Sequence, residues 1–274
     1  MNRIDATFEA LAAQNQAAFI PFLTAGDPDL GTTRRTIAAV ADAGADVIEL
    51  GFPFSDPIAD GPTIQASYTR ALDGGQRTED VFRMVEALRA ESQIPVVAMI
   101  SYSLVYRMGF DAFLDRAIAA GIDGATIPDL PVEEMEPLRG EADRRDFRLV
   151  CFVTPATTDA RRTMAARLAR GFIYYISVRG ITGARDRMPA DLAENIGKLK
   201  SQTQVPVAVG FGISRPEHAR AVGQVADGVI VGSALVSRMH GAAKSGGDPV
   251  RVAADFVAQM ATATHSARTG AAGQ

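Results

Sequence analysis

Cysteine and histidine are scarce in this chain. Among its 274 residues there is one cysteine, Cys151, and there are three histidines, His218, His240 and His265. A single cysteine excludes an intrachain disulfide and a zinc site built from several cysteines. The histidines follow neither an HxH nor an HxxxH spacing, so we expect no metal site. Cys151 lies in the apolar run LVCFV, and we expect it in the core because free cysteine is among the most buried residue types.

Long apolar runs and an excess of one charge are also missing. No run approaches the roughly 18 apolar residues of a membrane-spanning helix, and residues 1–14 lack the apolar core of a signal peptide. The net charge is only −4, from 28 Lys and Arg against 32 Asp and Glu. This balance argues against a nucleic-acid-binding surface, because such surfaces are usually basic. We therefore expect a soluble, cytoplasmic protein that binds neither nucleic acid nor membranes.

Eight short apolar runs alternate with longer amphipathic segments. The runs, which we predict to be strands, cover residues 18–26, 46–52, 95–102, 124–129, 148–155, 172–178, 206–212 and 227–234. Between them, apolar residues recur at spacings of three and four, as in TEDVFRMVEALRAES (78–92), which predicts helices. Near-continuous apolar strands are typical of a parallel sheet covered on both faces. Eight strand–helix units therefore predict an α/β fold, a single (β/α)8 TIM barrel.

The domain prediction follows from this pattern. The length of 274 residues suits one barrel, which typically has about 250. An open doubly wound sheet would show GxGxxG directly after its first strand, whereas this chain reads TAGDPDLG there. We expect one domain over 1–274 with a core at about 18–263, an extra N-terminal helix, a short extra helix near the eighth strand, and a disordered tail at about 264–274.

The segment VIELGFPFSDPIADG (47–61) contains two acids in unlike surroundings. Glu49 lies within an apolar run, where a carboxylate is costly to bury unless it is paired, neutralised or used. Asp60 follows on a loop that contains Pro53 and Pro57. Glu49 alone is compatible with a paired structural acid or a strand-end acid that faces water. The second acid favours a catalytic interpretation, because two carboxyl groups in different surroundings can take different proton-transfer roles.

Three glycine-containing segments follow the last strands. They are GITGAR (180–185), GFGIS (210–214) and VGSALVSR (231–238), and the third opens a helix. Any one glycine is explained by a turn. Together, however, they converge on the end of a barrel where loops 7 and 8 often bind phosphate, through close backbone approach and the N–H groups of a helix start. We therefore expect a phosphorylated substrate, with a hydroxyl contributed by Ser233.

The sixth strand carries the adjacent pair Tyr174 and Tyr175. Neighbouring residues of a strand point to opposite faces, so only one of these rings can look into the barrel. From periodicity alone, either is a packing aromatic.

Six segments resemble the α subunit of tryptophan synthase in order and spacing. They are PFLTAGDP (21–28), IELGFPFSDPIADGP (48–62), IPDLPVEE (127–134), GFIYYISVRGITGAR (171–185), VGFGIS (209–214) and VGSALV (231–236). The resemblance runs from Ile20 to about Phe256. The second segment is specific, whereas many phosphate-binding barrels share the glycine segments.

The resemblance implies retro-aldol cleavage of indole-3-glycerol phosphate to indole and glyceraldehyde 3-phosphate. It assigns general acid and base catalysis to Glu49, a hydrogen bond with the indole N–H to Asp60, and a place near the reacting centre to Tyr174. It implies substrate contacts by Phe22, Ile100, Tyr102, Thr182, Gly183, Phe211, Gly212, Gly232 and Ser233, of which Phe22, Ile100 and Phe211 wall the indole pocket and Gly183, Gly212, Gly232 and Ser233 hold the phosphate. It implies no cofactor on this chain, and a β subunit that carries pyridoxal phosphate in an α2β2 complex.

One segment departs from the family pattern. The family usually reads Tyr-x-Asn-x-Val-Tyr near the partner contact, whereas this chain reads Tyr102-Ser103-Leu104-Val105-Tyr106, one residue shorter and without the Asn. The contact with a partner is therefore expected to differ. Three alternatives remain: a free-standing indole-3-glycerol-phosphate lyase, an isomerase of a phosphorylated sugar on the same barrel, and a non-enzymatic chain that only activates a partner.

Overall fold

Eight parallel strands close into a barrel in the computed structural model, which describes residues 1–177, 190–210 and 212–268. The strands are β1 (Ala18–Thr24), β2 (Ile48–Gly51), β3 (Val96–Met99), β4 (Gly124–Thr126), β5 (Arg148–Val153), β6 (Ile173–Ile176), β7 (Val207–Gly210) and β8 (Gly228–Val231). Each pairs with the next, and β8 pairs with β1. All eight predicted strands are confirmed. The predicted runs are longer than the strands because most of them continue into the loops at the carboxyl ends.

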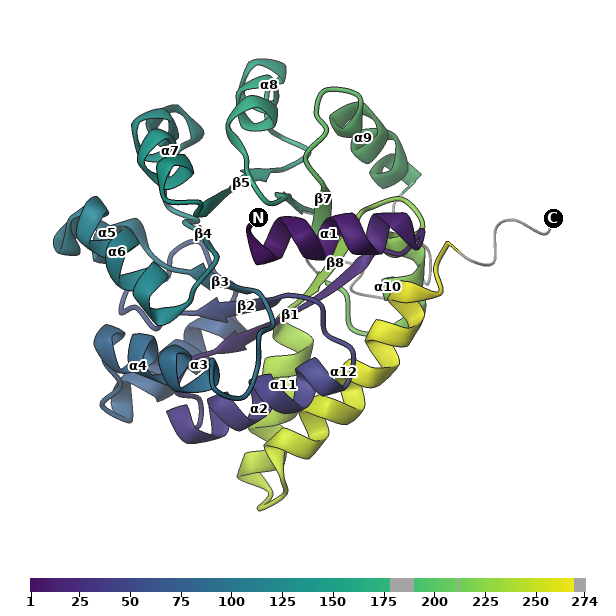
Figure 1. Ribbon diagram of the computed structural model, residues 1–274. Coiled ribbons are helices and arrows are strands. Elements are labelled where there is room, and N and C mark those ends of the chain that lie inside the picture. Colours follow the sequence, from purple (N-terminus) through teal and green to yellow (C-terminus); the bar gives the residue numbers. More distant parts are fainter. Residues whose placement is uncertain (178–189, 211, 269–274) are drawn as a thin grey trace.

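Helices surround the barrel (Figure 1). They are α1 (Arg3–Ala13), α2 (Leu30–Asp42), α3 (Pro62–Asp73), α4 (Thr78–Leu88), α5 (Tyr102–Met108), α6 (Phe110–Ala120), the 3-10 turn η1 (Val132–Glu134), α7 (Met135–Arg144), α8 (Asp159–Leu168), α9 (Ala190–Lys200), α10 (Pro216–Gly223), α11 (Ser233–Lys244) and α12 (Pro249–His265). The predicted N-terminal helix is α1. The helix predicted after the eighth strand is α11, which at 12 residues is not short.

The helix ends follow local chemistry. Asp29 caps α2 by accepting a hydrogen bond from the N–H of Thr32, which satisfies one of the free donors of the first turn. Gly121 ends α6 with φ of +88°, a left-handed conformation that glycine adopts without steric cost. These signals fix the lengths of the helices between the strands.

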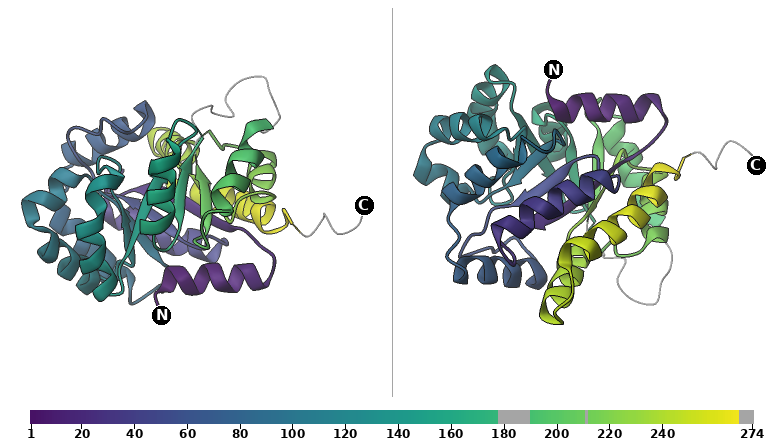
Figure 2. Two further views of the ribbon diagram at one scale, coloured as in Figure 1. Left: turned by 90° about the horizontal axis from the view of Figure 1, so that it is seen from above. Right: turned by 60° about the horizontal axis from the view of Figure 1, so that its bottom comes forward.

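Residues in the strands and just before them alternate between two apolar layers. One set, which includes Ile48 and Cys151, packs outward against the helices in the large core cluster. The other set fills the barrel interior: Ala18, Ile20, Val47, Val97, Val150, Phe172, Ala208 and Ile230. Ile4, Phe8 and Leu11 of α1 join this interior set, since α1 lies across the amino end of the barrel (Figure 2). Burial of each large apolar side chain contributes about 1.5–3 kcal/mol.

Cys151 lies in the core, as predicted. It is fully buried on β5, and its Sγ lies 3.5 Å from the Sδ of Met135 in α7. Burial raises the pKa of its thiol to about 12, so the reactive thiolate does not form near neutral pH.

The predicted tail begins too early. Residues 264–268 continue the ordered structure, because α12 extends to His265 and Thr264 is fully buried. The Thr264 hydroxyl donates to the carbonyl oxygen of Met260, which satisfies its polar group inside the core. Arg268 then donates hydrogen bonds to the backbone oxygens of Gly223 and Ala226. No helix in the described ranges is long and apolar enough to cross a membrane.

Candidate active site

Glu49 occupies the barrel interior near the carboxyl ends of the strands. Its strand position pairs with Phe22 on β1 and with Val97 on β3, and only 1% of its surface is exposed. Thr126 of β4 donates a hydrogen bond from Oγ1 to Glu49 Oε1 at 3.2 Å. Among the described residues, the charge that acts on Glu49 is the negative charge of Asp60. The carboxyl group is therefore buried without a cationic partner in this part of the structure.

Burial keeps Glu49 protonated at neutral pH. Loss of water around the carboxylate has the largest effect on its pKa, the hydrogen bond from Thr126 opposes that effect, and the nearby charge of Asp60 adds to it, so that the pKa rises from 4.5 to about 8. A carboxyl group with such a pKa can give up a proton and take one back near pH 7, as general acid and base catalysis requires.

Asp60 lies on the loop between β2 and α3 and is partly exposed. Its burial, together with the charge of Asp129, raises the pKa of its carboxyl group to about 6. Asp60 is thus mainly a carboxylate at neutral pH, while Glu49 is mainly neutral. The loop is tied to α3, because Gln65 donates hydrogen bonds to the backbone oxygens of Pro57 and Asp60. The two predicted acids therefore lie close enough to interact, with different charges.

Tyr174 faces the barrel interior and Tyr175 faces the surrounding helices. The Tyr174 ring centroid lies 5.1 Å from that of Phe152, and a Cβ added at Gly210 would lie 2.5 Å from the Tyr174 hydroxyl oxygen. Burial, and then the charges of Glu49 and Asp60, raise the pKa of Tyr174 well above its usual value. The hydroxyl group thus lies beside the two acids, and a residue larger than glycine at 210 would displace it.

Three residues around the acids were not predicted from the sequence. Tyr68 of α3 is 3% exposed, and its hydroxyl oxygen would lie 2.7 Å from a Cβ at Gly51, next to Glu49. Burial and the charges of Asp60 and Glu49 raise the pKa of Tyr68 well above its usual value. Asp129 accepts hydrogen bonds from Ser101 Oγ and the Tyr102 backbone N–H, both at 2.7 Å.

The third of these residues is Thr126. Its hydroxyl is unusual in the short apolar run GATIP (124–128). Strand alternation places Thr126 on the same face as Gly124, which is the interior face. That signal identifies the face but not the partner, since β2 and β4 are separated by β3.

A pocket opens beside Asp60 at this end of the barrel. Its lining consists of Phe52, Phe54, Asp56, Pro57, Ile58, Ala59, Asp60, Tyr68, Met99, Ile100, Ser101, Pro128 and Asp129. Ile100, one of the predicted pocket residues, is in this lining. Phe22 packs below it with Ile64, Tyr68 and Val236. Tyr102 lies at the start of α5, where its ring centroid is 6.0 Å from that of Tyr106, and is not part of this lining.

Three of the predicted phosphate residues, Gly212, Gly232 and Ser233, follow the ends of β7 and β8. Gly232 precedes α11, and Ser233 is its first residue, so the free N–H groups of this helix start lie directly after the carboxyl end of β8. A Cβ at Gly232 would lie 3.5 Å from Phe22, which places this helix start beside the interior aromatic residues. Gly212 adopts a φ of +74°, which favours glycine. Thr182, Gly183 and Phe211 lie outside the described residues.

The described residues contain no group of three or more His, Cys, Asp or Glu side chains arranged to hold a metal ion.

The sequence matches a known family over most of its length. The family model described as "Tryptophan synthase alpha chain" matches residues 8–265. A tryptophan synthase alpha chain from Rhodopirellula baltica is 47% identical over 262 residues, which cover 93% of this chain and 94% of the relative.

Solved structures agree with the sequence match. A tryptophan synthase subunit alpha from Legionella pneumophila superimposes with a TM-score of 0.90 at 35% identity, covering 96% of this chain and 98% of that one. A chain from the tryptophan synthase α2β2 complex of Pyrococcus furiosus superimposes with a TM-score of 0.84 at 37% identity, covering 89% and 98%. The chain therefore belongs to the tryptophan synthase alpha chain family.

Proposed function

We propose that this chain, as the α subunit of tryptophan synthase, cleaves indole-3-glycerol phosphate to indole and glyceraldehyde 3-phosphate, with Glu49, Asp60 and Tyr174 at the reacting centre. The observation that supports these roles is that the two neighbouring acids differ in charge. Glu49 is buried and mainly neutral near pH 7, and Asp60 is mainly charged. Retro-aldol cleavage needs both a proton carrier and a fixed negative charge, and these two residues supply them.

The first step protonates the substrate. Neutral Glu49 gives its proton to indole C3, and the ring becomes positively charged. Asp60 accepts a hydrogen bond from the indole N–H and stabilises this charge as it develops. This interaction is stronger than it would be in bulk water because Asp60 is partly buried.

The second step breaks the carbon–carbon bond. The Glu49 carboxylate now accepts the proton of the side-chain hydroxyl, whose oxygen forms the aldehyde carbonyl. The electron pair of the broken bond returns to the indole ring and removes its positive charge. Glu49 ends the cycle protonated, so one carboxyl group performs both transfers. Tyr174, whose hydroxyl lies beside both acids, would position the reacting part of the substrate.

The substrate has an indole ring at one end and a phosphate group at the other, and residues at the rim of the barrel could bind each of them. Its indole ring would lie against Phe22, Ile100 and Phe211, with Tyr102 nearby. Its phosphate would bind at the start of α11, through Gly232 and Ser233, with Gly212, Thr182 and Gly183 on the neighbouring loops. Gly232 lies next to Phe22, which supports one continuous site.

A β subunit is the proposed partner, in an α2β2 complex, and pyridoxal phosphate is expected on that subunit. The Pyrococcus furiosus relative belongs to such a complex. Two large apolar side chains near the pocket support a contact here, since Ile58 is 87% exposed and Tyr106 is 76% exposed. The shortened segment Ser103-Leu104 lies just before Tyr106 and is expected to weaken the contact rather than abolish it, because few interface positions are hot spots. A cytoplasmic location stays a prediction.

An indole-release assay tests the proposal. The purified chain is given indole-3-glycerol phosphate, with and without its cognate β subunit at concentrations well above about 1 µM, which corresponds to a weak complex. We expect slow release by the chain alone and faster release with the partner. A free-standing lyase would release indole at the same rate in both cases. No release in either case would contradict the proposal.

A further inference from the structure

Thr126 connects to Glu49 across the barrel interior. It is fully buried at the carboxyl end of β4, while Glu49 belongs to β2, and β3 lies between these strands. The hydrogen bond from Thr126 Oγ1 to Glu49 Oε1 is 3.2 Å long. It therefore does not arise from local sequence, and it engages one of the two carboxyl oxygens.

The groups around Glu49 differ in polarity from one side of its carboxyl group to the other. Below it, the interior is apolar, with Val47, Val97 and Ile20 of the interior cluster. Among the described residues, the titratable groups that interact with Glu49 are Asp60 of the loop after β2, Tyr68 of α3 and Tyr174 of β6. In the part of the chain that the structure describes, the hydrogen-bond partner and the titratable neighbours of Glu49 therefore come from β4, β6, α3 and the loop after β2.

We propose that Thr126 is a positioning residue for the proposed cleavage: it holds Oε1 of Glu49, so that Oε2 carries the proton to and from the substrate. This inference rests on the proposed function of Glu49. It adds a division of labour between two oxygen atoms that are otherwise equivalent.

The proton balance supports this division. In the neutral carboxyl group, a hydroxyl that donates to Oε1 favours the form in which Oε1 is the carbonyl oxygen and Oε2 bears the proton. After Oε2 has protonated C3, the carboxylate still accepts the Thr126 bond at Oε1. A lone pair of Oε2 is then free to take the proton of the substrate hydroxyl. Thr126 neither gains nor loses a proton in either step.

The bond also adjusts the acidity of Glu49. A hydrogen bond to the charged form lowers the pKa, whereas burial raises it. Thr126 thus opposes burial and keeps the pKa near the working range for a group that must both donate and accept.

Two substitutions separate the hydroxyl from the shape of the side chain. Thr126→Val keeps the branched shape, which suits a strand, and removes the hydroxyl. Thr126→Ser keeps the hydroxyl and removes the methyl group. The first readout is the pKa of Glu49 without substrate, from infrared difference spectra against Glu49→Gln. The second is indole release, as kcat and KM across pH.

We expect Thr126→Val to raise the pKa of Glu49 by about one unit, since the carboxylate loses a hydrogen bond. We expect kcat to fall about tenfold or more, with little change in KM, because the carboxyl group is no longer held in position. Because the protonated acid starts the reaction, the alkaline fall of kcat should move to higher pH. Thr126→Ser should retain the wild-type pKa and most of kcat.

Two results would overturn the inference. One is wild-type pKa and kcat in folded Thr126→Val. The other is the same loss in Thr126→Ser as in Thr126→Val, which would assign the effect to packing. The proposed function fails separately, if the wild-type chain releases no indole; the infrared titration would still show whether Thr126 and Glu49 are coupled.

Discussion

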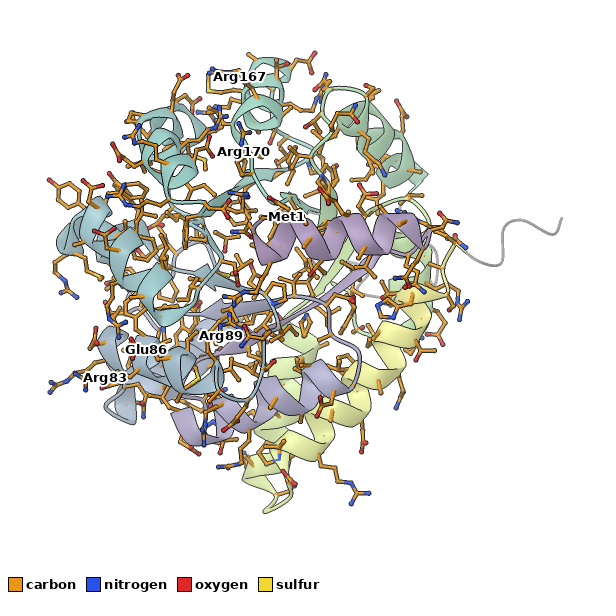
Figure 3. The ribbon with its side chains drawn as sticks, viewed as in Figure 1. Met1, Arg83, Glu86, Arg89, Arg167 and Arg170 are labelled. Carbon is orange, nitrogen blue, oxygen red and sulfur yellow. The ribbon has the colours of Figure 1, made fainter. Side chains whose placement is uncertain are left out.

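Acidic residues at the two ends of the barrel have opposite surroundings. At the amino end, Asp46, Asp123 and Asp227 each lie just before a strand. Each carboxylate accepts a hydrogen bond from a backbone N–H group at the start of the preceding strand in the chain. The donors are Phe19, Val96 and Val207, at 2.7, 2.8 and 3.0 Å respectively. Each also contacts cationic or protonatable side chains: His265 at Asp46, Arg3 and Arg89 at Asp123, and Lys200 and Arg268 at Asp227. Arg89 is labelled in Figure 3 on the face that α1 crosses.

The carboxyl end contains acids of a different kind. Glu49 accepts a hydrogen bond from a neutral hydroxyl, and the charge that acts on it among the described residues is that of another acid. An acid that joins strands benefits from a permanent charge and a permanent partner. An acid that transfers protons must exist in both charge states, and a close cation would hold it in one. The difference between the two ends thus separates acids that stabilise the fold from acids that act on the substrate.

The largest expected effect concerns Glu49 and activity. Glu49→Gln should lower kcat by roughly 100- to 10,000-fold, the usual contribution of general acid and base catalysis. The amide has a similar volume but cannot carry the proton. Indole release measures this effect, with Glu91→Gln as the matched control, since Glu91 pairs with Arg34 on the surface. Retention of more than roughly a tenth of the activity by folded Glu49→Gln would remove Glu49 from the mechanism.

The next effect concerns Asp123 and stability. Asp123→Ala should lower the free energy of unfolding by about 3–5 kcal/mol, because it leaves Arg89 and the Val96 N–H without their buried partner. The folded protein should cleave its substrate at nearly the wild-type rate. Urea unfolding measures the change. Glu91→Ala is the control and should cost at most about 1 kcal/mol, since its ion pair is exposed. An equal loss in both variants would contradict the contrast between the two ends.

A third effect links Glu49 to stability through pH. Its folded pKa of about 8 lies above the ordinary 4.5, so the folded protein binds more protons than the unfolded chain between these values. Stability from this group is therefore present below about pH 4.5 and is lost as pH rises through 8. Glu49→Gln, which does not titrate, should become more stable than the wild type at pH 9, by an amount on the order of a few kcal/mol. Urea unfolding of both proteins at pH 5 and pH 9 measures this effect. The same difference in denaturant midpoint between Glu49→Gln and the wild type at the two pH values would contradict this expectation.

The smallest effect concerns His265 at the amino end. Its hydrogen bond with Asp46, 2.8 Å long, raises the pKa of the imidazole, so its stabilisation is present at low pH and is lost as pH rises through the raised value. His265→Gln should lower the unfolding free energy by less than about 1 kcal/mol at pH 6, because the pair is partly exposed. Thermal melting at pH 6 and pH 9 tests whether this difference shrinks with pH.

The sequence predicted the barrel and the position of Glu49, because both follow from alternation within single segments. Eight apolar runs specify eight strands, and a carboxyl group inside one of them is visible without a structure. Thr126, Tyr68 and the pairs of Asp123 could not be predicted, since each depends on residues that only closure of the barrel brings together. The ordered end at 264–268 was missed for a related reason: its polar residues are satisfied by α12, by the end of α10 and by the loop before β8.

The most direct test of the account is the protonation state of Glu49 in the folded protein. Infrared difference spectra of the wild type against Glu49→Gln, recorded across pH without substrate, isolate this carboxyl group. The account predicts a protonated carboxyl band that persists through pH 7 and disappears around pH 8. Loss of the band near pH 4.5, the ordinary value for glutamate, would contradict the claim that burial, with no cationic partner among the described residues, makes Glu49 the proton carrier.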